Sequence, residues 1–331
     1  MDNFLKSSYK TYSKCVTITL TEGPSYNLNM RGDTMKKTST VKASLIGNTS
    51  ALGLNWIYDQ DFLKEYTKNN DALFHPVNKD IYDKAKNAFY VYKNHNVGDL
   101  GYMGAVLYLL YKNLQNNSSL TQEQWINALI DYIKPGGEYI GYVETSGNHL
   151  IANYLNSQIS KTDITFISGF EDKQLIGLLP FLAVYDLEIE NKVEYSTLLA
   201  KTMTSFDQIN DYNRLLFSLF ESIKNGKNKQ VALTESINFA PDTIKGSLTK
   251  ALEMIDTYSF IESHSGFACY IEMTLPLIFH IVAHCETVEE ALRLNAKLSG
   301  ASSARGLFIG AIYNLLTGIN EEYLDILNVK I

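Results

Sequence analysis

The sequence has few cysteines, no long apolar run and no excess of positive charge. Cys15, Cys269 and Cys285 are widely spaced and odd in number, which indicates reduced thiols in a cytoplasmic protein and not a disulfide framework. No apolar run reaches the roughly 18 residues of a membrane-spanning helix, so we expect no membrane span. The net charge of −7 argues against binding to nucleic acid or to anionic membranes.

What the sequence does contain is helical periodicity supported by 45% apolar residues. From about Thr38 onward, apolar residues recur at helical spacing, without alternating strands between the helices. Thr121 and Gln124 predict a capping box, and Pro180 predicts a bend within a buried helix. We therefore predict one large all-α domain, a compact multi-helix fold, over residues 36–331. Residues 1–35 include a strand-like segment that does not fit this pattern, and we predict a mobile or peripheral N-terminal extension.

The run SGASSARGLFIGAIYNLL, which begins at Ser299, is a loop of small residues that leads into an apolar helix. Ser302 or Ser303 is expected to cap that helix. Arg305 lies in its first turn, where a cation opposes the helix dipole. A carboxylate such as Asp59 or Asp99 would offset the charge, and a bound phosphate is the alternative because arginine binds phosphate through two hydrogen bonds.

Few other residues suggest chemistry. Asp59 and Asp99 are candidate catalytic carboxylates, able to act as a base or to contact a ribose hydroxyl, and each is alternatively a helix cap or an ion-pair partner. The adjacent Glu171 and Asp172 are expected to be ordinary acidic residues in the first turn of a helix. The four-residue spacing of His280 and His284 could bind metal, but no third ligand accompanies it, which favours core packing.

Five stretches, taken in order, resemble the ADP-ribosylglycohydrolase family. They are LIGNTSALGLNWIYD, NVGDLGYMGAVLYLL, ISGFEDKQLIGLLPFLAVYD, GFACYIEMTLPLIFHIV and EEALRLNAKLSGASSARGLFIGAIYNLLTG. The likeness is closest to the J-type crystallin branch, in which a tryptophan, an aromatic residue and an aspartate follow the first helix. The resemblance covers roughly residues 38–318 and implies the compact all-α fold of that family.

The resemblance also implies two magnesium ions, which the family's hydrolases hold through acidic motifs before an early and a late helix. Magnesium requires a near-octahedral set of hard oxygen ligands. In this sequence the corresponding positions are Gly101, Tyr102, Met103, Ala301, Ser303 and Ala304, and the carboxylates are missing from both motifs. We therefore expect no metal ligands and a dinuclear mechanism that has been lost.

Three functions follow as expectations. The first is a silent member of the fold, a pseudoenzyme that retains at most a pocket for ADP-ribose or a related nucleotide-sugar. The second is an active hydrolase that cleaves an ADP-ribosyl N- or O-glycosidic bond with a rearranged site based on Asp59 or Asp99. The third is a purely structural, crystallin-like protein. The residues expected to line a ligand pocket are Trp56, Tyr102, Ser302, Ser303 and Arg305.

Overall fold

Two helices from opposite ends of the described chain cross at the centre of the fold. The computed structural model describes residues 35–162 and 170–330, and in it α1 (Thr40–Ser50) packs along α15 (Ser302–Leu316). A Cβ atom at Gly47 would overlap the carbonyl oxygen of Gly306, and one at Gly306 would overlap that of Gly47. Glycine is therefore required at this crossing because the two backbones are in direct contact.

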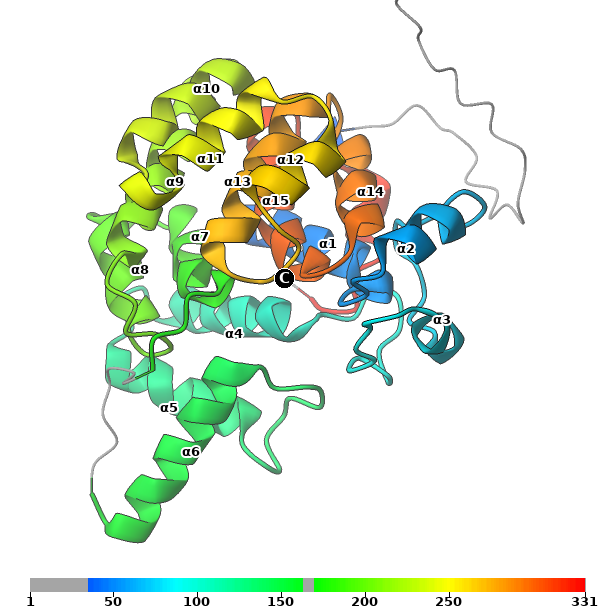
Figure 1. Ribbon diagram of the computed structural model, residues 1–331. Helices are drawn as coiled ribbons and strands as arrows, with labels where there is room; N and C mark the ends of the chain where they lie inside the picture. Colours follow the sequence, from blue (N-terminus) through cyan, green and yellow to red (C-terminus); the bar gives the residue numbers. More distant parts are fainter. Residues whose placement is uncertain (1–34, 163–169, 331) are drawn as a thin grey trace, which may run out of the picture. The chain divides into compact units, whose positions relative to one another are not determined.

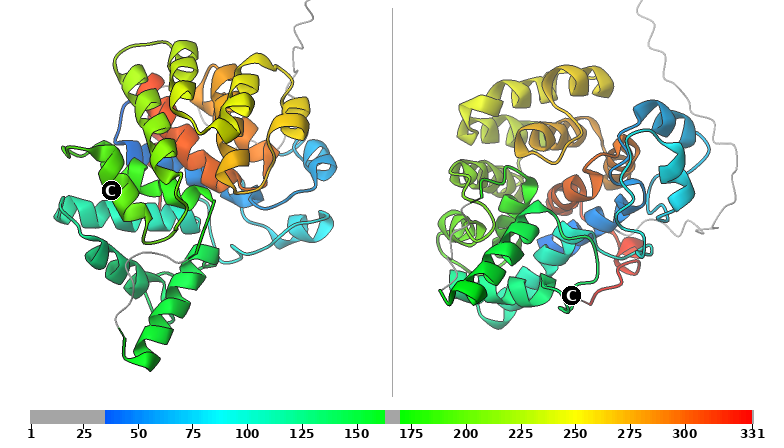
Figure 2. Two further views of the ribbon diagram at one scale, coloured as in Figure 1. Left: turned by 60° about the vertical axis from the view of Figure 1, so that its left-hand side comes forward. Right: turned by 60° about the horizontal axis from the view of Figure 1, so that its bottom comes forward.

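Other helices pack around this pair, as Figures 1 and 2 show from three directions. Contacts with α15 come from α4 (Tyr102–Asn116), α9 (Ile209–Lys224), α13 (Ile271–His284) and α14 (Val288–Leu298). The helix α7 (Leu179–Tyr185) packs against α1 and α4. The start of α15 is thus enclosed by helices, and the all-α architecture expected from the periodicity is confirmed.

The remaining elements complete the layers around this centre. The α-helices are α2 (Gln60–Tyr66), α3 (Lys79–Lys84), α5 (Gln122–Ile133), α6 (Thr145–Ser160), α8 (Lys192–Ala200), α10 (Lys229–Ser236), α11 (Asp242–Glu253), α12 (Thr257–His264) and α16 (Glu321–Leu324). Short 3-10 helices are η1 (Leu52–Leu54), η2 (Leu175–Leu178) and η3 (Ile237–Phe239). Two short strands, β1 (Met35–Lys36) and β2 (Ile319–Asn320), pair antiparallel.

Local sequence signals account for several helix ends. Thr121 and Gln124 form the predicted capping box at the start of α5. The prediction for Pro180 is wrong in detail, because Pro180 lies in the first turn of α7, directly after η2, and does not bend a longer helix. Proline is favoured in a first turn because a backbone N–H at that position would have no acceptor within the helix, so its absence costs no hydrogen bond. The strand-like segment predicted from Cys15 lies outside the described residues.

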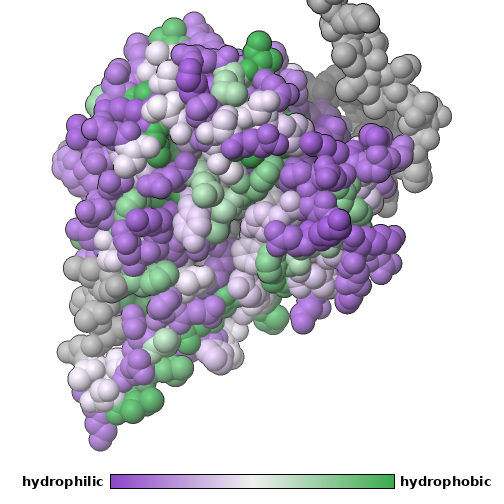
Figure 3. Space-filling model, in the orientation of Figure 1, coloured by the Kyte–Doolittle hydropathy of each residue, from purple (hydrophilic) through white to green (hydrophobic). Residues whose placement is uncertain are grey.

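Helix α6 extends away from the helices that surround α15 (Figure 1). Apolar side chains reach its surface near the far end, where Leu155 is 49% and Ile159 80% exposed, and Figure 3 shows hydrophobic colour in this region. None of the described helices combines the length and the hydropathy needed to cross a membrane.

Of the histidine pair on α13, His280 lies in the interior and His284 is partly buried. His280 is fully buried and stacks on Phe260 with ring centroids 4.6 Å apart. Its Nε2 atom is 3.0 Å from the Thr257 hydroxyl, and His284 Nε2 is 3.1 Å from the carbonyl oxygen of Ala251. Burial lowers the pKa of His280 to about 4, as expected of a neutral histidine packed in a core.

Candidate functional site

The starts of α4 and α15 meet at the C-terminal end of α1, and Asn48 joins them. The N–H of Gly101 donates to Asn48 Oδ1 at 2.9 Å, and Asn48 Nδ2 donates to the carbonyl oxygen of Ser303 at 3.0 Å. A Cβ atom at Gly104 would overlap Asn48 Oδ1, so the approach of α4 depends on that glycine. One fully buried amide therefore connects the two helix starts without any charge.

A second asparagine, Asn55, accepts a backbone N–H at the start of α15. The N–H of Ser303 donates to Asn55 Oδ1 at 2.9 Å, whereas the hydroxyl of Ser302 donates to the carbonyl oxygen of Ala51 at 3.2 Å. The predicted capping by Ser302 or Ser303 is therefore wrong, since the N-cap residue is Ala301 and no side chain of the helix caps it. Because this helix start is buried against the segment after α1, that segment supplies the acceptor.

The loop before α15 is fixed to the loop after η1. The N–H of Trp56 donates to the carbonyl oxygen of Gly300 at 2.7 Å, and the N–H of Gly300 donates to that of Ile57 at 3.2 Å. Trp56 adopts a positive φ of 66°, which is uncommon for a non-glycine residue. The Trp56 ring lies 5.4 Å from that of Tyr142 and 6.3 Å from that of Tyr92, so it lines this region with aromatic surface.

Arg305 is completely buried behind the same loop. Its Nε atom donates to Asn295 Oδ1 at 3.0 Å and its Nη2 atom to the carbonyl oxygen of Ser299, while Nη1 has no hydrogen-bond partner in the structure as described. Burial lowers the pKa of Arg305 to about 9. The ion pairs among the described residues include no carboxylate bound to Arg305, and the two described acceptors of its hydrogen bonds are neutral oxygens.

Asp59 and Asp99 serve local structure. Asp59 caps α2 by accepting the N–H of Phe62 at 3.1 Å, and it also accepts the N–H of Lys86 at 2.8 Å. These backbone hydrogen bonds, that of Lys86 first, lower the pKa of Asp59. Asp99 accepts the N–H of Asn96 at 2.7 Å and the side-chain amide of Asn328 at 2.8 Å. Both oxygens of each carboxylate are therefore occupied by groups other than Arg305.

Two other carboxyl groups are buried, that of Glu144 at the start of α6 and that of Asp172 in the loop before η2. Glu144 is 8% exposed and Asp172 3% exposed. The hydroxyl of Tyr92 accepts the N–H of Tyr102 at 3.1 Å and donates to Glu144 Oε1 at 3.4 Å, which links the start of α4 to this carboxyl group. Asp172 Oδ1 accepts the N–H of Gln174 at 2.9 Å. We refer to Glu144, Asp172, Tyr92, Tyr102 and Ser146 as the carboxyl cluster.

The carboxyl cluster favours protonated forms. Burial, and then the charge of Asp172, raises the pKa of Glu144 to about 8. Burial likewise raises the pKa of Asp172 and, together with the charge of Glu144, raises that of Tyr102 well above its ordinary value. Glu144 is therefore a neutral carboxylic acid near pH 7, able to donate a hydrogen bond.

Sequence reasoning named Tyr102 as a pocket residue but did not identify the grouping of Glu144, Ser146 and Asp172 beside it. Asp172 lies in the loop before η2 and not in the first turn of a helix, so the interpretation of Glu171 and Asp172 as a first-turn pair is wrong. Glu144 is the N-cap residue of α6, but its side chain makes no capping hydrogen bond. The one local signal is Gly147 in the first turn of α6, where a Cβ atom would overlap the hydroxyl of Tyr102.

Comparisons with known proteins identify the fold of this chain. No family model matches the sequence. No curated protein matches it at the significance required. The chain is similar in fold to a solved ADP-ribosylglycohydrolase-related protein complex. The match has a TM-score of 0.60 and 12% sequence identity, and it covers 88% of this chain and 92% of the other. At this identity the likeness establishes the fold, as the five ordered stretches had led us to expect.

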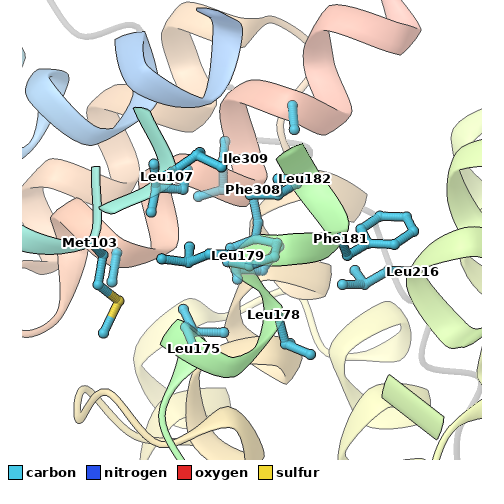
Figure 4. Packing of buried hydrophobic residues seen from close by; sticks show 14 of the residues in the cluster. Met103, Leu107, Leu175, Leu178, Leu179, Phe181, Leu182, Leu216, Phe308 and Ile309 are labelled. Atoms are coloured by element: carbon cyan, nitrogen blue, oxygen red, sulfur yellow. The ribbon is translucent and has the colours of Figure 1, made fainter. Parts of the chain in front are cut away.

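The residues present do not fit the magnesium centre that the resemblance implies. The side chain of Met103 is 2% exposed and lies in an apolar cluster near Leu107 and Leu175 (Figure 4). Gly101, Ala301 and Ala304 have no side-chain oxygen. No group of three or more His, Cys, Asp or Glu side chains within residues 35–162 and 170–330 is placed to hold a metal ion. A hard divalent cation would find too few oxygen ligands at these two helix starts.

Surface hollows occur elsewhere on the molecule. One of about 590 Å³ lies beside α8 and α9, where Val193, Arg214 and Phe217 line it. Another of about 750 Å³ includes Tyr185, Asp186 and Lys224 in its lining. Neither hollow is lined by residues of the carboxyl cluster, so the chemistry-bearing groups and these surface hollows are separate features.

Proposed function

We propose that this protein is an ADP-ribosylglycohydrolase-like pseudoenzyme that binds an ADP-ribose-like ligand without dinuclear magnesium catalysis. The observation that carries the proposal is the junction of α4 and α15. Asn48 and Asn55 satisfy these two helix starts with neutral amides, at the positions where the resemblance implies metal-binding carboxylates. These neutral amides, already hydrogen-bonded to backbone groups, supply neither the negative charge nor the free oxygens that magnesium requires.

The ligand class is supported by the surroundings of this junction. Trp56 is partly exposed and contacts Tyr142, so a flat base or sugar face could pack against these rings. Tyr102, Ser302, Ser303 and Arg305 are buried, and we assign them to the base of the proposed pocket. The fold similarity to an ADP-ribosylglycohydrolase-related protein favours ADP-ribose or a related nucleotide-sugar among flat, polar ligands.

A second candidate is a metal-independent hydrolase of ADP-ribosyl groups. It is favoured by Glu144 and Asp172, two buried carboxyl groups with raised pKa values. A protonated Glu144 could act as the general acid for a leaving group, and Asp172 could act on the attacking water once it is ionised. This candidate replaces Asp59 and Asp99, whose oxygens accept structural hydrogen bonds, with Glu144 and Asp172.

Calorimetric titration of ADP-ribose, with magnesium and with EDTA, tests the proposal together with assays of release from ADP-ribosylated arginine and serine. We expect binding of equal affinity in both buffers and no release. Magnesium-dependent turnover would overturn the proposal. Metal-independent turnover that Glu144→Gln abolishes, and that Glu171→Gln leaves unchanged, would establish the second candidate. Absence of any binding would leave the structural, crystallin-like role.

A further inference from the structure

Helix α6 has no Asp, Glu, Lys or Arg in its 16 residues, although these four types make up 20% of the chain. More than half of its residues are nevertheless exposed. A helix on the surface of a protein normally carries charged residues on its solvent side. The exposed side of α6 is therefore an uncharged surface on an otherwise strongly charged chain.

One side of α6 attaches the helix to the rest of the fold. Leu150 and Ser157 are buried, and Tyr154 is half-buried against the main hydrophobic core. These positions recur at intervals of four and three, so they share one face of the helix. Helix α5 is in contact with α6. The attachment of α6 is thus explained by this inner face alone.

The opposite side of α6 carries four exposed residues that we call the α6 stripe, namely Asn148, Ala152, Leu155 and Ile159. They recur at intervals of four, three and four, which places them within about 60° of one another around the helix axis. Leu155 is 49% and Ile159 80% exposed, and hydrophobic colour marks this part of the surface in Figure 3. Uncharged residues at this spacing form the seam along which two helices pack.

The α6 stripe is complementary in size to an antiparallel copy of itself. Ala152 lies three positions before Leu155, and Ile159 lies four positions after it. If two α6 helices pair antiparallel about Leu155, each Leu155 packs near its own counterpart. Each Ile159 then faces the small Ala152 of the other copy. Large side chains meet small ones in this arrangement, as close packing of two helices requires.

Charge also favours a second copy of the chain as the partner. In a twofold dimer, residues near the axis face their own counterparts, so a charge there would meet a like charge. Each chain carries a net charge of −7, and the α6 stripe brings two copies together without placing like charges opposite each other. A membrane surface fits less well, because helices that lie on membranes carry Lys and Arg on their polar face.

We propose that the α6 stripe is a homodimer contact, in which two copies of this chain pair through antiparallel α6 helices. A helix of this length is about 24 Å long and about 10 Å wide. A pair that uses this face alone buries less than the roughly 800 Å² per partner of a stable interface. The dimer is therefore weak and forms reversibly as the protein concentration rises.

Sedimentation velocity of the full chain, over a roughly hundredfold range of protein concentration, tests the contact. We expect a reversible monomer–dimer equilibrium that Leu155→Arg and Ile159→Arg each weaken by about tenfold or more, because each would bury a charge against the other copy. Asn153→Arg is the matched control, since Asn153 is exposed on the same helix but lies outside the stripe. Added salt should strengthen the wild-type dimer, because it screens the repulsion between two chains of like charge.

A second measurement tests the antiparallel register. Under mild oxidation, Leu155→Cys should yield a disulfide-linked dimer, because the two introduced thiols lie close together across the twofold axis. Asn153→Cys, which points away from the seam, should yield no more of this dimer than the wild-type chain with its own cysteines. Equal cross-linking in the two variants would contradict the register.

A chain that stays monomeric at every concentration would overturn the proposal. So would a dimer that both arginine variants retain unchanged, with circular dichroism and melting temperature like those of the wild type. Exposed positions tolerate such substitutions with little effect on stability, so the variants are expected to fold. If the monomeric chain instead binds anionic lipid vesicles, and Leu155→Arg abolishes that binding, the α6 stripe is a membrane contact and the homodimer is refuted.

Discussion

Two regions with different chemistry meet at Tyr102. The backbone of Tyr102 belongs to the junction of α4 and α15, and its hydroxyl group belongs to the carboxyl cluster. At the junction, Asn48 and Asn55 satisfy backbone groups with neutral amides, and the backbone of Tyr102 is bound by the Tyr92 hydroxyl. In the carboxyl cluster, the buried carboxyl groups of Glu144 and Asp172 lie beside the hydroxyl groups of Tyr102 and Ser146, and burial raises the pKa of both carboxyl groups. Neutral, hydrogen-bonded side chains hold helices together, whereas buried ionisable groups with raised pKa values are candidates for a functional site.

The same comparison separates two roles of small residues. Gly47, Gly104 and Gly306 permit close backbone or side-chain approach around the junction, which packing alone explains. Gly147 gives space to the Tyr102 hydroxyl, which belongs to the carboxyl cluster. Five substitutions can break or sharpen this contrast between a structural and a functional region.

The largest effect is expected from Gly306→Val at the crossing of α1 and α15. Its side chain would overlap the carbonyl oxygen of Gly47, and backbone cannot move aside as a flexible side chain could. We expect a loss of about 3 kcal/mol or more of unfolding free energy, measured by urea denaturation. The matched control is Gly246→Ala in α11, where a Cβ atom meets nothing within 4 Å. It should stabilise the protein by about 0.5–1 kcal/mol, and equal losses in both variants would contradict the role of the crossing.

A smaller loss is expected from Asn48→Ala at the junction. The change leaves the N–H of Gly101 and the carbonyl oxygen of Ser303 buried without their partner. We expect a loss of about 2–3 kcal/mol, measured by the same denaturation. Asn113→Ala is the control, since it removes an amide that donates only to Leu109 within the same helix. A loss no greater than that of the control would show that the junction does not depend on Asn48.

The next effect depends on pH and concerns Glu144→Gln. The folded state keeps the proton of Glu144 up to about pH 8, whereas the unfolded carboxyl group loses it near its ordinary pKa of 4.5. The folded state therefore binds more protons in this interval, and wild-type stability should fall as pH rises through it, by on the order of 1 kcal/mol per pH unit. Glu144→Gln should remove this slope in thermal melts at pH 5–8. A slope that persists unchanged in the variant would contradict a buried, protonated Glu144.

The smallest effect is expected from Asp59→Ala and Asp99→Ala. Asp59 caps a short helix, so its loss should lower the melting temperature slightly and leave ligand binding unchanged. Asp99 binds Asn96 and Asn328, and the same result is expected. Calorimetry with ADP-ribose and melting curves measure the two quantities separately. Loss of binding or turnover in either variant would instead support the catalytic role predicted from the sequence.

Much of the fold could be predicted because it depends on local patterns. Helical spacing from Thr38 onward and the capping box at Thr121 are read from neighbouring residues, and the structure confirms them. Helix starts in contact with distant segments could not be predicted in this way. Ser302 and Ser303 have the right chemistry for a cap, but Asn55 accepts the N–H of Ser303 instead because folding brings it there. Pro180 likewise follows η2, a short turn that its neighbours in sequence did not reveal.

The sequence by itself determined the helical class, the glycine-rich helix starts and the absence of carboxylates from the positions where the resemblance implies magnesium ligands. Only the tertiary structure decided where the remaining carboxyl groups lie. Glu144 and Asp172 are 28 positions apart in the sequence and look like ordinary polar residues of turns. Burial beside Tyr102 raises their pKa values, and burial is a property of the packed chain that no local pattern encodes.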